Sequence, residues 1–290
     1  MSYPASSLCS FVPTATTNDN NEEIQLVDTR DGKTYWVSKL KDGKCWMTQN
    51  LDLDLSTSKA LTPNDSDVTA SWTPNKNMYT PNQIGSWTIN LNSADSYDPG
   101  DWYYQEGANV VEHNYTTNGA NANFNTTPFA SNGMHGHIGN MYNFQAYTAI
   151  NDSSSMKSTG TTNTSICPKG WTLPSDYLGL LLAYGAISVN GSTVTTINEK
   201  ALMAKPLYFV RSGVAIGSSN GDPGYVNYPG IILMYPTNKY HYVKVGWTES
   251  WQETVIQVYN PAQLSSDPSN TINQAYYGRG AGITVRCVAR

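Results

Sequence analysis

Apolar and polar residues alternate along the early part of the chain in the way that is typical of short β-strands. Two such runs, residues 24–30 and 35–40, are separated by Asp31-Gly32, and a third run, residues 45–47, follows Asp42-Gly43. An Asp-Gly pair between strand-like runs is a strong hairpin signal, because Gly readily adopts the positive φ that tight turns require. The pattern therefore predicts an antiparallel meander of three strands.

Further strand-like patterns occur at residues 51–55 and again late in the chain, at 230–235, 240–247, 253–259 and 282–288. The first of these, Leu-Asp-Leu-Asp-Leu, alternates strictly and predicts a strand with its leucines on one face. The run at 230–235 is continuously apolar and predicts a buried strand.

Helical spacing is found in the middle of the chain. Residues 140–150 carry Met141, Phe144 and Tyr147 at three-residue intervals, which predicts one helix. Pro174-Ser175 predicts the start of a second helix that runs through Ala186, with Ser175 as its N-cap. A short helical turn is expected at 198–204, before Pro206. Strands and helices that do not repeat as β-α-β units favour an α+β fold.

The rest of the chain predicts one domain with an unusual insertion. Residues 1–23 are rich in Ser, Thr and Asn and predict an N-terminal arm, which is tied down only if Cys9 is bridged. Residues 24–290 form the single domain. Within it, residues 56–135 are poor in regular patterns and predict a loop-rich insertion. We expect this insertion to be held by its own aromatic residues, which are Trp72, Trp87, Trp102, Tyr103 and Tyr104.

Charge excludes some classes of partner. Only 13% of residues are charged, the net charge is −5, and Lys and Arg do not cluster. Nucleic-acid binding requires a basic surface that neutralises phosphates, so no nucleic-acid partner is expected. A surface built from Asn, Ser, Thr, Gln and Tyr suits an extracellular protein.

The apolar runs are too short to cross a membrane. The longest, residues 177–189 and 230–235, fall short of the roughly 20 residues that span a bilayer, so we expect a core helix and a buried strand instead. The residues after Met1 do not form the apolar stretch of an export signal. We expect a secreted or cell-surface protein whose export signal and anchor have been removed from this chain.

Four cysteines are spaced as an early pair, Cys9 and Cys45, and a late pair, Cys167 and Cys287. They form no C-x-x-C motif and have no flanking His, which disfavours a zinc site. Of the three possible connectivities we favour the bridges Cys9–Cys45 and Cys167–Cys287. Four buried free thiols are the alternative, which a cytosolic location would favour.

Five segments, in the same order along residues 24–290, resemble the Fibrobacter succinogenes major paralogous domain family of bacterial surface proteins. They are Asp31-Gly-Lys-Thr-Tyr-Trp-Val, Cys45-Trp-Met-Thr-Gln-Asn-Leu, Gly139-Asn-Met-Tyr-Asn-Phe-Gln-Ala, Cys167-Pro-Lys-Gly-Trp-Thr-Leu-Pro and Gly282-Ile-Thr-Val-Arg-Cys-Val. The chain departs from the family pattern between residues 224 and 259.

The resemblance implies a C-type-lectin-like fold, which is also the fold of formylglycine-generating enzymes and of retroelement-diversified variable proteins. In that fold two helices pack on twisted antiparallel sheets, and the first and last strands meet. The resemblance also implies that Cys167–Cys287 joins the start of the second helix to the terminal strand. Members of the family are presumed to be displayed adhesins or recognition proteins.

Aromatic and amide side chains crowd the segment from 224 to 279, which is the composition of a binding surface. The residues that we predict to bind a ligand are Tyr225, Asn227, Tyr228, Asn238, Tyr240, Tyr242, Trp247, Trp251, Tyr259, Tyr276, Tyr277 and Arg279. The ligand would be a protein or glycan on another cell surface. The alternative is that about half of the aromatic residues in this segment are core.

A second hypothesis is that residues 212–279 are a hypervariable region written by a diversity-generating retroelement, because Asn, Tyr, Ser, Asp and Thr are enriched there. Ordinary surface polarity is the competing explanation, since residues 56–135 are equally polar.

Metal and catalytic sites are weakly indicated. Asp95, Asp98 and Asp101 could hold a structural calcium ion, which prefers several oxygen ligands; Asp65 with Asp67 is a weaker pair. Without that ion, no cofactor is expected. The nearby pair His135 and His137 lacks an evident third ligand. A formylglycine-type or metal-dependent enzyme is the third hypothesis, but no catalytic motif supports it, so a non-enzyme is expected.

Overall fold

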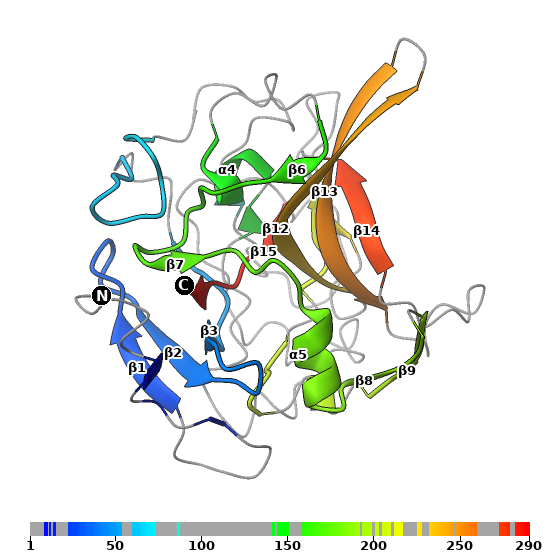
Figure 1. The fold of residues 1–290 in the computed structure, drawn as a ribbon. Helices are drawn as coiled ribbons and strands as arrows, with labels where there is room; N and C mark the ends of the chain where they lie inside the picture. The colour runs from blue at the N-terminus through cyan, green and yellow to red at the C-terminus, as the bar shows by residue number, and fades with distance from the viewer. Residues whose placement is uncertain are drawn as a thin grey trace.

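The computed structural model describes residues 9–10, 12, 14–15, 23–53, 60–72, 86–87, 141–142, 144–150, 158–191, 193–198, 201–202, 205–209, 212–216, 225–227, 232–245, 248–259, 273–278 and 282–290. Most of these residues lie in or between antiparallel sheets, and the described helices are short: α4 (Phe144–Thr148) and α5 (Leu178–Ala183) (Figure 1). The chain is therefore β-rich with α+β character, which agrees with the coarse fold class predicted from the sequence.

The predicted meander forms one side of a five-stranded sheet. Its strands are β1 (Glu23–Val27), β2 (Thr34–Lys39) and β3 (Cys45–Met47), paired antiparallel in that order. Gly32 and Gly43 lie in the two connecting turns with φ of +81° and +80°, as the Asp-Gly signals predicted.

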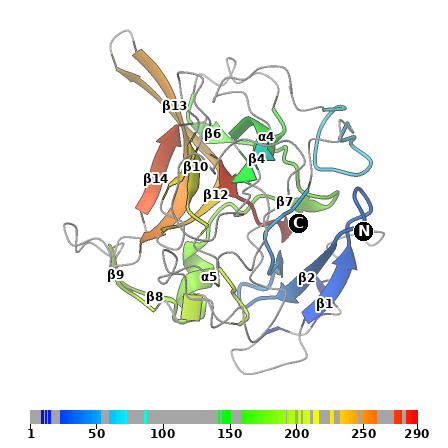
Figure 2. The same ribbon diagram turned by 180° about the vertical axis from the view of Figure 1, so that it is seen from behind.

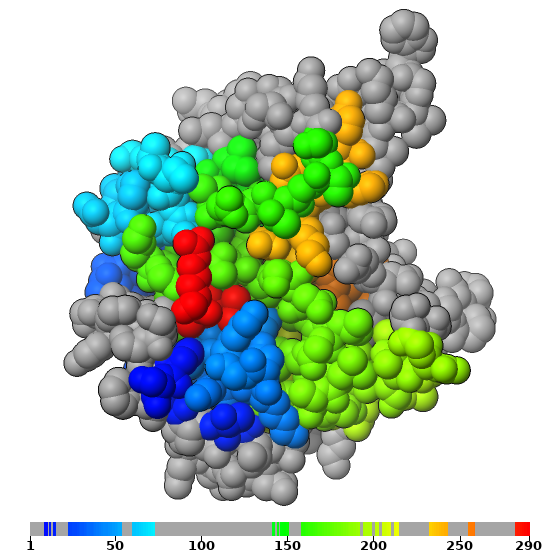
Figure 3. All heavy atoms as spheres, in the orientation of Figure 1, coloured from blue at the N-terminus to red at the C-terminus, as the bar shows by residue number. Residues whose placement is uncertain are grey.

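Segments distant in sequence complete this sheet. The order is β1-β2-β3-β16-β7, so the C-terminal strand β16 (Val288–Ala289) lies between β3 and β7 (Trp171–Thr172). The expectation that the first and last strands meet is thus wrong in detail, because β3 and not β1 pairs with β16. In Figure 3 the C-terminal residues (red) reach the surface between residues 60–72 (cyan) and the early strands (blue).

A second sheet has the order β14-β13-β12-β6. Its centre is a long hairpin of β12 (Ile232–Val245) and β13 (Thr248–Tyr259), flanked by β14 (Asn273–Gly278) and the two-residue strand β6 (Gly160–Thr161). The predicted strands at 230–235 and 240–247 are thus one strand. Its register shifts between Pro236 and Tyr240, where a bulge accommodates a residue that cannot donate a ladder hydrogen bond.

Smaller sheets complete the described part of the chain. They are β15-β5-β4, formed by Ile283–Thr284, Met141–Tyr142 and Ser86–Trp87; β10-β11, formed by Val214–Ile216 and Tyr225–Asn227; and β8-β9, formed by Ile187–Asn190 and Thr193–Ile197.

The long hairpin separates two hydrophobic clusters. Ile232 and Met234 belong to the first cluster, together with α4, whereas Leu233 and Tyr235 belong to the second, which also contains Leu180 and Leu181 of α5. Successive strand residues point to opposite faces, so the inner half of β12 is buried on both sides. Tyr235 is therefore a core residue and cannot be part of a presented aromatic surface.

The helices are shorter than the sequence patterns predicted. The second helix does not begin at Ser175: its N-cap is Tyr177, which makes no side-chain cap hydrogen bond. It ends before Gly185, whose φ is +62°, and Ile187–Asn190 pairs as β8, so the predicted core helix 177–189 is wrong in its second half. At the other helix, Met141 and Tyr142 pair in β5, which leaves only Phe144–Thr148 helical.

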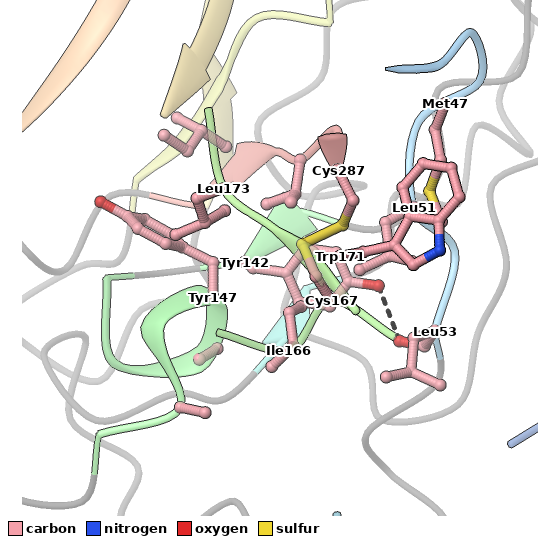
Figure 4. Packing of buried hydrophobic residues seen from close by; sticks show 14 of the residues in the cluster. Met47, Leu51, Leu53, Tyr142, Tyr147, Ile166, Cys167, Trp171, Leu173 and Cys287 are labelled. Atoms are coloured by element: carbon pink, nitrogen blue, oxygen red, sulfur yellow. Dashed lines mark hydrogen bonds between the residues drawn. A yellow bond between two sulfur atoms is a disulfide. The ribbon is translucent and has the colours of Figure 1, made fainter. Parts of the chain in front are cut away.

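The Leu-Asp-Leu-Asp-Leu segment forms no strand over its described residues, 51–53. Leu51 and Leu53 are nevertheless buried in the first cluster, and Tyr142 donates a hydrogen bond to the Leu53 carbonyl (Figure 4). Asp52 is buried beside Lys33, whose ammonium group lies 2.7 Å from its carboxylate. The alternation correctly predicted that the leucines face the core. The strand that it also predicted is not formed at these described residues.

The insertion is only partly described. Trp72 is buried in the first cluster and pairs through its backbone with Leu61, and Trp87 pairs in β4 with Met141. These two aromatic residues thus lie against the main body of the chain. Trp102, Tyr103 and Tyr104 lie outside the described residues.

Both predicted disulfides are present, and the free-thiol alternative is wrong. Cys9–Cys45 ties the N-terminal arm to β3, and Cys167–Cys287 joins the segment before β7 to the residue before β16. Cys167 leads into β7 and does not lie at the start of the helix, so the bridge joins the segments that lead into two strands of the first sheet. Within the described part of the chain, no helix combines the length and apolarity that a membrane span requires.

Candidate functional site: the outer end of the β12–β13 hairpin

The predicted ligand-binding residues differ in how far the structure describes them. Tyr228, Trp247 and Arg279 lie outside the described residues. The backbone alone is described for Tyr225, Asn227, Trp251, Tyr259, Tyr276 and Tyr277. The side chains of Asn238, Tyr240 and Tyr242 are described.

The outer end of the β12–β13 hairpin projects away from the core, as Figures 1 and 2 show from opposite sides. Its register pairs Tyr240 with Glu253 and Tyr242 with Trp251, and β14 adds Tyr277 opposite Glu253. Alternate strand positions share a face. The register therefore brings four of the predicted positions, Tyr240, Tyr242, Trp251 and Tyr277, to one face of the sheet.

Other predicted positions lie elsewhere in the sheets. Tyr225 and Asn227 belong to β11, in a separate two-stranded sheet. Tyr259 pairs with Ile232 at the inner end of the hairpin, and Tyr276 pairs with Thr254 and so occupies the opposite face from Tyr277. The predicted residues are thus not one continuous surface by strand register.

Tyr240 anchors the hairpin to the body of the protein. Its ring packs edge-on against Phe144 of α4, with centroids 6.1 Å apart, and it is partly buried against the first cluster. The ring also lies over Gly160 of β6, where a Cβ atom would stand 2.8 Å from the tyrosine oxygen. This close approach explains the glycine. Tyr240 consequently has a structural role that the sequence pattern did not indicate.

We expect Gly160→Ala to displace the Tyr240 ring and lower the free energy of unfolding by about 1–3 kcal/mol, the usual cost of overpacking. Chemical denaturation measures this loss. Because the closest contact is the tyrosine oxygen, adding Tyr240→Phe to Gly160→Ala should recover part of the loss. Equal stability of Gly160→Ala and the wild type would contradict the described packing.

Asn238 lies in the bulge of β12 and joins neighbouring segments through its backbone. Its N–H donates to the Pro174 carbonyl at 2.8 Å, and its carbonyl accepts from the Thr162 N–H at 2.7 Å. The side-chain oxygens of Asn238 and Thr162 are both buried without a hydrogen-bond partner. An oxygen that is closed off from solvent is poorly placed to meet a ligand, so the described contacts of Asn238 are structural.

Tyr242 is the described aromatic residue that is best placed for contact with a partner. It is partly exposed and stands beyond the end of the short strand β6. The Thr159 hydroxyl accepts the Tyr242 N–H at 3.2 Å and lies 2.9 Å from His241 Nδ1. These hydrogen bonds hold the strand in place where the β6 ladder stops.

The predicted calcium residues Asp95, Asp98 and Asp101, and the pair His135 and His137, lie outside the described residues. Among the residues that are described, no three His, Cys, Asp or Glu side chains come together in a way that could hold a metal ion.

The weaker acidic pair, Asp65 and Asp67, is engaged in structural contacts. Asp65 accepts hydrogen bonds from the N–H and hydroxyl of Thr62 and from the Ser66 hydroxyl. Asp67 forms an ion pair of 2.6 Å with Arg290. Burial raises the pKa of Asp67, and the charge of Arg290 opposes that shift.

A buried arginine lies beneath the hairpin. Arg286 donates from Nε to Asn50 Oδ1 at 2.9 Å and from its terminal nitrogens to the carbonyls of Leu207 and Tyr208. Its guanidinium carbon lies 4.5 Å from the Phe209 ring centroid and 5.2 Å from that of Tyr235. Burial lowers the pKa of Arg286.

The strand-like pattern at 282–288 did not indicate this role of Arg286, although an arginine inside a largely apolar run is a usable signal. The enzyme hypothesis has a separate difficulty, which is that all four cysteines are bridged. Thiol-based chemistry of the formylglycine type would first have to open one of these bonds.

Comparisons of the chain with protein-family models, with curated protein sequences and with solved structures gave no match.

Proposed function

We propose that the chain is a non-catalytic recognition protein, secreted or displayed on a cell surface, with a C-type-lectin-like fold of the Fibrobacter succinogenes major paralogous domain type. Three features support this proposal: the five sequence segments that resemble the family, the placement of the C-terminal strand within the sheet of the early meander, and the buried Cys167–Cys287 bridge. Disulfides persist in oxidising compartments, which favours an extracellular location.

The observation that carries the binding proposal is the Tyr242–Trp251 pair on the outer end of the β12–β13 hairpin. In this register Tyr242 and Trp251 occupy directly opposed positions of the two strands. Tyr and Trp supply large contact areas at a low cost in conformational entropy, and they are the residues on which binding energy concentrates. The partner is a protein or glycan of another cell surface.

The test compares two hairpin variants for binding to a printed glycan array and to an array of purified extracellular proteins. Tyr242→Ala with Trp251→Ala removes the aromatic pair and should weaken binding about thirtyfold or more, since two such anchors contribute roughly 2 kcal/mol. Val243→Ala with Ser250→Ala changes the next register pair, on the opposite face, and should bind within about threefold of the wild type.

Near-UV circular dichroism of both variants establishes that the core is retained. If the aromatic double variant binds as tightly as the wild type, the outer hairpin is not the binding site. If both variants lose binding equally, the hairpin contributes its shape and not the aromatic pair.

A further inference from the structure

We draw no further inference here: the strongest candidate, the surface patch that Gln25, Val27 and Thr34 form beside Trp36 on the outer face of the five-stranded sheet, is an exposed sheet face for which nothing in the described part of the chain shows what covers it.

Discussion

Replacing Arg286 with alanine is expected to lower the free energy of unfolding by about 4 kcal/mol, a large part of the total stability of a typical domain. The guanidinium is buried and hydrogen-bonded to Asn50 and to the carbonyls of Leu207 and Tyr208. Alanine removes these hydrogen bonds, at a cost of about 1–3 kcal/mol for each buried acceptor that loses its donor, and it opens a cavity beside two aromatic rings.

The contacts of Arg286 connect distant parts of the chain. Asn50 also accepts a hydrogen bond of 2.8 Å from the Tyr235 hydroxyl, so one amide oxygen holds both the arginine and strand β12. The rings of Phe209 and Tyr235 lie against the guanidinium, an arrangement worth about 2 kcal/mol when it is desolvated. Loss of the arginine should therefore loosen the base of the candidate binding hairpin.

Denaturant unfolding of three variants separates the causes. Arg286→Met keeps most of the volume and removes the hydrogen bonds, so we expect about half of the loss seen with alanine. Arg290→Ala removes a half-exposed arginine that pairs with Asp67 and should cost less than about 1 kcal/mol. Equal losses for Arg286→Ala and Arg290→Ala would contradict the buried role of Arg286.

The second large effect is expected from Cys167→Ala with Cys287→Ala, which should lower the free energy of unfolding by about 5 kcal/mol. This bridge joins cysteines 120 residues apart, and the loop-entropy relation gives about that value for a loop of such length. Both cysteines are fully buried in the first cluster, so small cavities add to the loss.

The matched control is Cys9→Ala with Cys45→Ala, which removes the bridge between cysteines 36 residues apart. The same relation gives about 4 kcal/mol for this shorter loop, so the Cys167→Ala, Cys287→Ala variant should be less stable than the control by about 1 kcal/mol or more. Denaturation midpoints under identical buffer conditions measure the difference. Equal stability of the two double variants would show that loop length and burial do not set these contributions.

Local signals in the sequence were sufficient for the early meander. A tight turn depends on a few adjacent residues, and Gly32 and Gly43 adopt the positive φ that the Asp-Gly pairs implied. The alternation at Leu51 and Leu53 likewise showed which side chains are buried, because alternation is a local response to one apolar face.

The helix boundaries, and the fact that residues 51–53 form no strand, could not be predicted in the same way. Residues 187–190 follow the spacing of a core helix, yet they pair with 193–197 once Gly185 turns the chain. Met141 and Tyr142 continue a helical pattern, but they form a strand that pairs antiparallel with residues 283–284. Pairing with a remote or newly turned segment outweighs weak helical propensity.

The sequence by itself determined the strand order of the meander and the enrichment of tyrosine in the late segment, and it favoured the cysteine pairing that the structure contains. Only the tertiary structure decided that Tyr235 is core, that Tyr240 is an anchor over Gly160, and that Tyr242 stands opposite Trp251 near a projecting tip. The reason is physical: a tyrosine side chain can fill a core or contact a partner, and its neighbours across the sheet, distant in sequence, select between the two.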